Sequence, residues 1–179
     1  MRLILTRTDP LMVCDPPNLE TERLVLRPMT MGDWPAYAEL MLSERAVHMG
    51  GPFDMAGTWG MFCSDAAQWS LMGHGALMVD EKTTGQRLGQ VCINYGPLFP
   101  EHELGWFLFP FAEGRGIAAE AAIAMRKWAF AVRGLKTLVS YIAPRNMRSI
   151  HLAERLGASL DPDAARTDPD DLVYRHFPD

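Results

Sequence analysis

The stretch that decides the fold of this chain is Glu113-Gly114-Arg115-Gly116-Ile117-Ala118-Ala119-Glu120. It follows the apolar run Leu104-Gly105-Trp106-Phe107-Leu108-Phe109 and opens a segment of helical apolar spacing that reaches Val132. The pattern predicts a strand, a short glycine turn and a helix whose first N–H groups are unpaired at the positive end of the helix dipole. Such a helix start suits a diphosphate, and two glycines let the backbone approach it closely. Alone, a Gly-x-Gly turn is weak evidence, because many strand–helix connections use glycine for steric reasons.

The composition predicts one folded domain. The chain has 179 residues, of which 48% are apolar and 22% charged, and its formal net charge is −5. This acidic balance argues against an extended nucleic-acid-binding surface. We find no apolar run of the roughly 20 residues that span a bilayer and no signal-peptide core in residues 1–17. The scattered cysteines (Cys14, Cys63 and Cys92) predict reduced thiols in a cytoplasmic protein and match neither disulfide nor metal spacing.

Hydrophobic periodicity predicts ten alternating elements. The expected strands are residues 22–27, 76–80, 88–95, 103–109, 138–143 and 172–176. The expected helices are a first one capped by Thr30, a second from Met55 to Gly73, a third from Gly116 to Gly134, and a short fourth one stopped by Gly157. The order β-α-α-β-β-β-α-β-α-β predicts an α/β (α+β) fold with a mixed, mostly antiparallel sheet. A central βαβ crossover should make the strands around Trp106 and Ser140 parallel neighbours.

Two helical faces are predicted to be buried. On the second helix the expected core stripe is Met55, Trp59, Phe62, Ala66 and Trp69, with a ligand pocket as the alternative interpretation. On the third helix it is Ile117, Ala121, Ala124, Trp128 and Val132.

Four motifs, taken in order, resemble the GCN5-related N-acetyltransferase (GNAT) superfamily, and most closely its ribosomal-protein-alanine acetyltransferases. The resemblance covers about Leu19 to Phe177, and it implies a domain of residues 19–179 after an N-terminal extension of residues 1–18. It implies a single acyl-CoA N-acyltransferase domain with splayed central strands. The matching segments are Leu19-Glu20-Thr21-Glu22-Arg23-Leu24-Val25-Leu26-Arg27, Glu103-Leu104-Gly105-Trp106-Phe107-Leu108, Gly114-Arg115-Gly116-Ile117-Ala118-Ala119-Glu120-Ala121, and Asn146-Met147-Arg148-Ser149 followed by Leu156-Gly157-Ala158.

The resemblance implies a set of residues that bind acetyl-CoA. Gly114 shapes the loop, and the backbone N–H groups of Arg115, Gly116, Ile117 and Ala118 would hold the pyrophosphate. The strand with Trp106, Phe107 and Leu108 would offer its free edge to the pantetheine amides and the thioester carbonyl. Asn146 and Ser149 would contact the pantetheine arm. A purely structural interpretation stays open, since Asn146 is also a good helix N-cap.

Acetyl transfer to an amine requires a base and an acid. The acceptor arrives largely as an ammonium, with a pKa of about 8 for an α-amine or about 10 for a lysine. Glu103 is the candidate base, directly or through a water, with an ordinary outward strand residue as the alternative. Ser149 is the candidate proton donor to the leaving thiolate, with Tyr141 as the alternate. One position departs from the superfamily pattern: Glu113, an acid beside the loop, which we expect to face solvent because an acid beside a diphosphate is unfavourable.

The sequence therefore predicts a cytoplasmic, acetyl-CoA-dependent N-acetyltransferase without a metal. The acceptor is a protein N-terminal α-amine or a small-molecule amine, bound by the helices near Trp34 to Trp69. A non-catalytic acyl-CoA-binding module is the alternative. A nucleotide-phosphate enzyme is disfavoured because no Gly-x-x-x-x-Gly-Lys-Ser/Thr run exists. We expect neither nucleic acid nor membrane as a partner, and an exposed edge at the last strand would permit a homodimer.

Overall fold

The structure is a computed structural model that describes residues 15–178, so most of the predicted extension 1–18 lies outside the described residues. Its elements alternate as the sequence predicts, with several short additions. They are β1 (Leu19–Glu20), β2 (Leu24–Pro28), η1 (Met31–Asp33), α1 (Trp34–Met41), η2 (Glu44–Met49), α2 (Met55–Met72), β3 (Ala76–Glu81), β4 (Arg87–Gly96), β5 (Phe99–Leu108), η3 (Pro110–Ala112), α3 (Ile117–Ala131), β6 (Leu138–Ile142), α4 (Met147–Arg155), β7 (Ser159–Leu160) and β8 (Leu172–His176).

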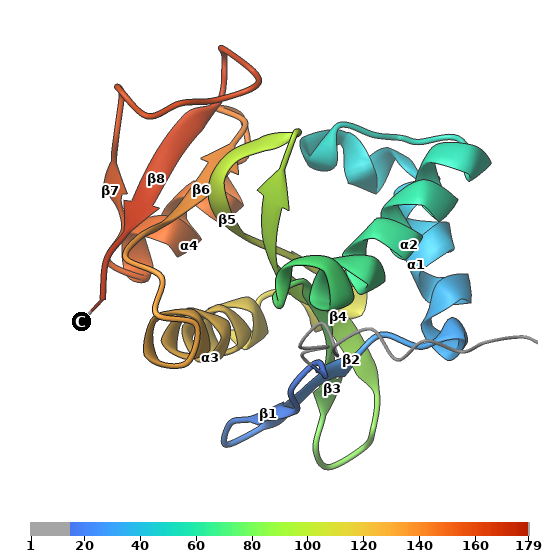
Figure 1. Cartoon of the computed structure of the whole chain (residues 1–179). Coiled ribbons are helices and arrows are strands. Elements are labelled where there is room, and N and C mark those ends of the chain that lie inside the picture. The colour runs from blue at the N-terminus through green and yellow to red at the C-terminus, as the bar shows by residue number, and fades with distance from the viewer. Residues whose placement is uncertain (1–14, 179) are drawn as a thin grey trace, which may run out of the picture.

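One eight-stranded sheet organises the chain in the order β1-β2-β3-β4-β5-β6-β8-β7. Every neighbouring pair is antiparallel except β5 and β6, which are parallel and joined through α3. This confirms the predicted mixed sheet with a central βαβ crossover. In Figure 1, β6, β8, β7 and α4 lie on one side of β5, and α1 and α2 lie on the other.

Helix α3 covers the sheet with a face of small and large apolar residues. Ile117, Ala121, Met125 and Trp128 are buried in the main core, which includes residues of β2, β3, β4 and β5. Val132, predicted on the same face, is 69% exposed because the helix has ended at Ala131.

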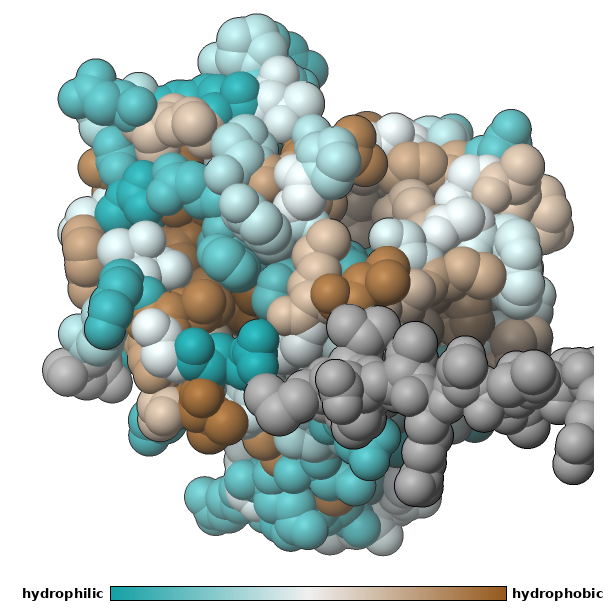
Figure 2. Space-filling view, viewed as in Figure 1, coloured by the Kyte–Doolittle hydropathy of each residue, from teal (hydrophilic) through white to brown (hydrophobic). Residues whose placement is uncertain are grey.

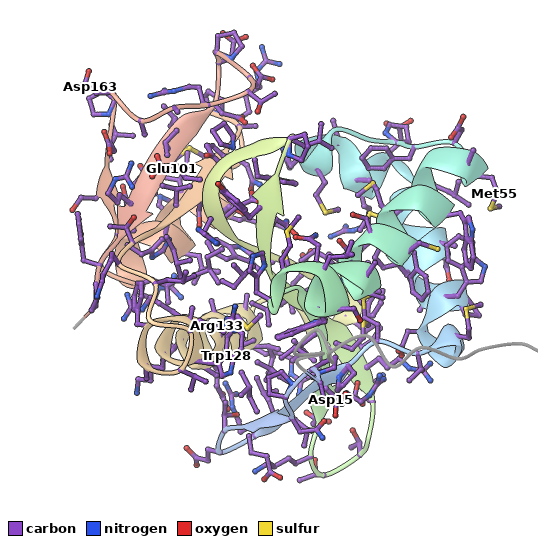
Figure 3. All side chains as sticks on the ribbon, in the orientation of Figure 1. Asp15, Met55, Glu101, Trp128, Arg133 and Asp163 are labelled. Atoms are coloured by element: carbon purple, nitrogen blue, oxygen red, sulfur yellow. The ribbon has the colours of Figure 1, made fainter. Side chains whose placement is uncertain are left out.

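The predicted core stripe of α2 is correct for only two of its members. Phe62 and Trp69 are buried, whereas Met55 is 57% and Trp59 44% exposed, and Ala66 is exposed as well. Met55 lies at the outer end of the helix, away from the sheet (Figure 3). Thr58 and Gln68 are buried instead, so the buried face of the helix is not the one that the apolar spacing predicts. Figure 2 shows the resulting mixture of apolar and polar residues over α2, in contrast to the hydrophilic surface around the β3–β4 turn.

The last strand is not the edge that the sequence predicts. β8 lies between β6 and β7, and Ser159 and Leu160 of β7 pair with Arg175 and Tyr174. The two-residue β7 was too short to predict from periodicity. It covers part of β8, so an exposed edge at the last strand does not support a homodimer here.

No helix in residues 15–178 is long and apolar enough to cross a membrane.

Candidate active site

The parallel strands β5 and β6 separate almost as soon as they pair. Their only registered pair is Glu103 with Val139. Just beyond it, the Ser140 hydroxyl donates a 2.6 Å hydrogen bond to the carbonyl of Leu104, so a side chain takes the place of a ladder bond. From there on, the residues of β5 pair only with β4. The predicted splay of the central strands is present, and it leaves one edge of β5 free.

The glycine turn before α3 has the conformation that a phosphate loop needs. Gly114 and Gly116 have φ of 73° and 77°, a left-handed region that residues with a side chain rarely adopt. Gly116 is the N-cap of α3, and the first hydrogen bond across the helix start runs from the Glu120 N–H to its carbonyl. The described residues provide no partner for the N–H groups of Ile117 and Ala118. The loop therefore presents free donors at a helix N-terminus.

The arginines next to this turn are already paired with acids. Arg115 forms an ion pair with Glu81 of β3, and Arg23 pairs with Glu120 at 2.6 Å while donating to the carbonyl of Arg115. Burial opposes ionisation of Glu120, but hydrogen bonds from Thr21 and Arg23 outweigh it and lower its pKa. Glu120 thus ties α3 to the first strands.

Glu113 is partly exposed, as expected of an acid that avoids the loop, but it is not free. Its side chain is 31% exposed and pairs at the surface with Arg45 of η2 and, at 2.6 Å, with Arg148 of α4. The sequence did not predict these pairs, because both arginines are distant in sequence. Their charges compensate the acid beside the loop.

A cavity of about 200 Å³ lies at the splay, where the two halves of the sheet meet. Its walls come from α1, η2 and α2 on one side and from β6 and α4 on the other, above a floor of β4 and β5. The lining residues on which the site depends are Tyr37, Met41, His48, Met61, Asp65, Gln90, Cys92, Asn94, Glu103, Trp106, Phe107, Tyr141, Asn146 and Ser149.

Glu103 lies in this cavity at the base of the splay. Its carboxylate accepts a 2.8 Å hydrogen bond from the Asn94 amide, and the backbone N–H of Tyr141 also favours its charged form. Burial raises its pKa to about 7, helped by the charges of Asp171 and Asp65 and opposed by those two interactions. No described Lys or Arg pairs with it. Glu103 is therefore not the ordinary outward strand residue that was the alternative interpretation.

Comparisons with known proteins now identify the family. The model of the acetyltransferase (GNAT) domain matches residues 23–159. The chain belongs to the GNAT acetyltransferases.

Solved structures agree with this assignment. An acetyltransferase from Agrobacterium tumefaciens is 53% identical, with a TM-score of 0.89 over 99% of this chain and 100% of its own. Two others share the fold at lower identity. The ribosomal-protein-S5-alanine acetyltransferase of Vibrio fischeri is 18% identical (TM-score 0.67, covering 90% and 97%). The spermidine N-acetyltransferase of Vibrio cholerae, solved with CoA and spermine, is 16% identical (TM-score 0.66, covering 87% and 94%).

In this GNAT protein, some of the other predicted site residues line the cavity, whereas Leu108 and the turn from Gly114 to Ala118 lie outside its lining. Trp106 and Phe107 line it, whereas Leu108 packs against the main core. Asn146 and Ser149 line it from the start of α4, where the Asn146 side chain also caps the helix by accepting from the Ser149 N–H at 3.2 Å. The capping role that the sequence left open is therefore real, and it does not remove the residue from the cavity.

Tyr141 also lines the cavity, and its hydroxyl accepts a hydrogen bond of 3.3 Å from the Glu101 N–H. Burial raises its pKa, so its hydroxyl keeps its proton at neutral pH. Cys92, predicted to be a packing residue, is buried in the cavity floor with a pKa well above its usual value because of burial and the neighbouring carboxylates. Its thiol is therefore neutral.

Sequence reasoning missed a second carboxylate in the cavity, Asp65 of α2. It is held by Tyr37 and Gln90, which were also missed. One signal was available, because Asp65 is the only charged residue of the eighteen in α2. Among residues 15–178, no group of three or more His, Cys, Asp and Glu could hold a metal ion.

Proposed function

We propose that this protein transfers the acetyl group of acetyl-CoA directly to a primary amine. The observation that carries the proposal is the position of Glu103: a carboxylate without a cationic partner in the described chain, placed where β5 and β6 part. A base at that point lies next to the free edge of β5, where a thioester carbonyl would be bound.

The coenzyme lies along the splay in this proposal. The N–H groups of Arg115, Gly116, Ile117 and Ala118 hold its pyrophosphate, since the turn is preformed and its donors are free. The pantetheine arm runs along the edge formed by Trp106, Phe107 and Leu108 and passes Asn146 and Ser149. Donors on the free edge would stabilise the oxyanion of the tetrahedral intermediate.

The reaction moves protons in two directions. Glu103 accepts a proton from the ammonium of the acceptor, and its pKa of about 7 suits a base that works near neutrality. The amine nitrogen then attacks the thioester carbonyl, the carbon–nitrogen bond forms, and the carbon–sulfur bond breaks as the intermediate collapses. The departing thiolate takes a proton from Ser149, or from Tyr141, whose raised pKa keeps the hydroxyl protonated. As the amide forms, the second amine proton passes through water to the hydroxyl that protonated the thiolate, and Glu103 then releases its proton to solvent.

A non-catalytic acyl-CoA-binding module is the competing interpretation. Such a module would need the loop and the splay but no base at their junction. The half-buried Glu103, which costs stability because its charge has no described counter-ion, therefore favours an enzyme.

Thermal shift and thiol release test the proposal together. Coenzyme A and acetyl-CoA should each raise the Tm, while ATP and NAD at equal concentration should not. A ligand at a hundred times its Kd stabilises the native state by about 2.7 kcal/mol, which is several degrees for a domain of this size. Amine-dependent release of free thiol then identifies turnover. A shift without release from any amine would favour the module, and no shift at all would overturn coenzyme binding.

A further inference from the structure

A second carboxylate, Asp65, shares the cavity with Glu103 and has half of its hydrogen-bonding capacity left. Its Oδ2 accepts from the Tyr37 hydroxyl at 3.0 Å and from the Gln90 amide at 3.1 Å. No described residue donates to Oδ1. Within residues 15–178, no Lys or Arg lines the cavity.

Two carboxylates that form no ion pair with the described chain destabilise the folded state when they lie in one small cavity. Burial raises the pKa of Asp65 to about 6, although the hydrogen bonds from Gln90 and Tyr37 favour the charged form. An uncharged residue such as Asn could accept the same two hydrogen bonds without that cost. Among residues 15–178 no ion pair of Asp65 is formed, although His48 also lines the cavity, so the acid is left for a cationic ligand to pair with.

The two acids occupy opposite ends of the same floor. Gln90, which holds Asp65, and Asn94, which holds Glu103, point to the same side of β4 with Cys92 between them. Four residues of an extended strand span about 13 Å. The charges of both acids act on the Cys92 thiol, as expected for a residue between them. Thioether and aromatic side chains of Met41, Met61 and others complete the walls. The cavity thus offers a negative group at each end and an apolar middle.

We propose that Asp65 binds the second ammonium group of a small diamine acceptor whose first amine lies at Glu103. The inference rests on the proposed acetyl transfer and specifies its substrate class. An aliphatic diamine matches the charges at both ends and the apolar floor between them. A peptide N-terminus carries one ammonium followed by neutral amides, and it leaves Asp65 unpaired.

The test is a comparison of alkane diamines with monoamines of the same chain length, using acetyl-CoA and thiol release. For the wild-type protein, kcat/KM should be at least about tenfold higher for the best diamine than for its matched monoamine, as expected for a desolvated charge contact. The advantage should depend on chain length, because only some diamines reach both acids.

Asp65→Asn is the decisive variant, since its amide oxygen can still accept from Tyr37 and Gln90. It should raise the KM of the diamine and remove most of the diamine-over-monoamine ratio. The ratio is the readout, because loss of the Asp65 charge also acts on Glu103 and so affects every amine. Glu39→Gln is the matched control, because Glu39 is an exposed acid of the neighbouring helix that does not line the cavity. It should leave the ratio as it is.

The proposal is overturned if the wild-type protein has the same kcat/KM for diamines and matched monoamines, or if Asp65→Asn lowers both values equally. It is also overturned if peptides with a free α-amine have a higher kcat/KM than every diamine. Should the variant fail to fold, the chain-length series on the wild type still decides. In all of these cases thiol release from some amine continues. Loss of release from every amine, or no thermal shift with coenzyme A, is instead a failure of the proposed acetyl transfer.

Discussion

The two sides of the proposed site are built from different parts of the polypeptide. On the proposed coenzyme side, the backbone makes the site: two glycines with positive φ, free N–H groups at the start of α3, and the free edge of β5. On the proposed acceptor side, side chains make it, with Asp65 of α2 held by Tyr37 of α1 and Gln90 of β4. Glu103 lies where the two sides meet.

This difference determines which substitutions each side can tolerate. A backbone site depends on conformation and is destroyed by a Cβ or a charge in the turn, but it accepts many side chains around it. A side-chain site depends on identity, so a single isosteric change alters recognition while the fold stays intact. Substitutions on the two sides should therefore have separable effects on coenzyme affinity and on acceptor use.

The largest effect on turnover is expected at Glu103, where the two sides meet. Glu103→Gln keeps the shape and can still accept from Asn94, but it removes the base. Turnover should fall by roughly 10²–10⁴-fold, with acetyl-CoA affinity nearly unchanged. In the wild type, the pH profile of kcat/KM should rise through about pH 7, where Glu103 loses its proton, and the variant should lack this limb. Full turnover across the pH series would show that Glu103 is not the base.

The second-largest effect is expected from a negative charge placed in the glycine turn before α3. Gly116→Asp puts a side chain and a negative charge at a residue with φ of 77°, so coenzyme A affinity should fall by at least about tenfold, or 1.4 kcal/mol. Gly134→Asp is the control at the other end of α3, where φ is 66° and a Cβ meets open space. Calorimetry should show weakened binding only for the first variant. Equal affinities would remove the turn from the site.

A smaller effect is expected on stability from the acceptor side. The folded pKa of Asp65, about 6, lies above its ordinary value of 3.8, so the folded state holds this proton to higher pH than the unfolded state does. The free energy of unfolding therefore falls as the pH rises from about 4 to about 6. Above that range Asp65 is charged in both states, and the destabilisation no longer changes with pH.

Asp65→Asn has no such proton to lose. Above pH 6 it should be more stable than the wild type by up to about 3 kcal/mol, or several degrees in Tm, and the difference should narrow towards pH 4. A Tm difference that is independent of pH would mean that the carboxylate is not destabilised by burial.

The mildest change concerns the leaving group. Ser149→Ala removes the hydroxyl but keeps the backbone N–H that Asn146 caps, so α4 should stay intact. Turnover should fall by about tenfold or less, because water or Tyr141 can supply the proton. A loss as large as that of Glu103→Gln would make the hydroxyl the principal acid. Wild-type rates would assign the role to Tyr141 or water.

The sequence was most informative where chemistry is encoded over a few consecutive residues. The strand before Gly114, the turn and the helix after Gly116 follow from local periodicity and glycine. Those same rules predicted the order of the long elements and the crossover. Glu103 was found because it lies on the strand that the turn identifies.

Contacts between distant segments were decided only by the tertiary structure. Glu113 is paired with Arg45 and Arg148, which lie 68 and 35 residues away. The two partners of Asp65 lie 28 and 25 residues away in sequence. Local patterns determine backbone conformation because each residue there responds to its near neighbours. The pairing of buried charges depends on which elements pack together. For that reason the glycine loop could be predicted from the sequence, whereas the partners of Asp65 could not.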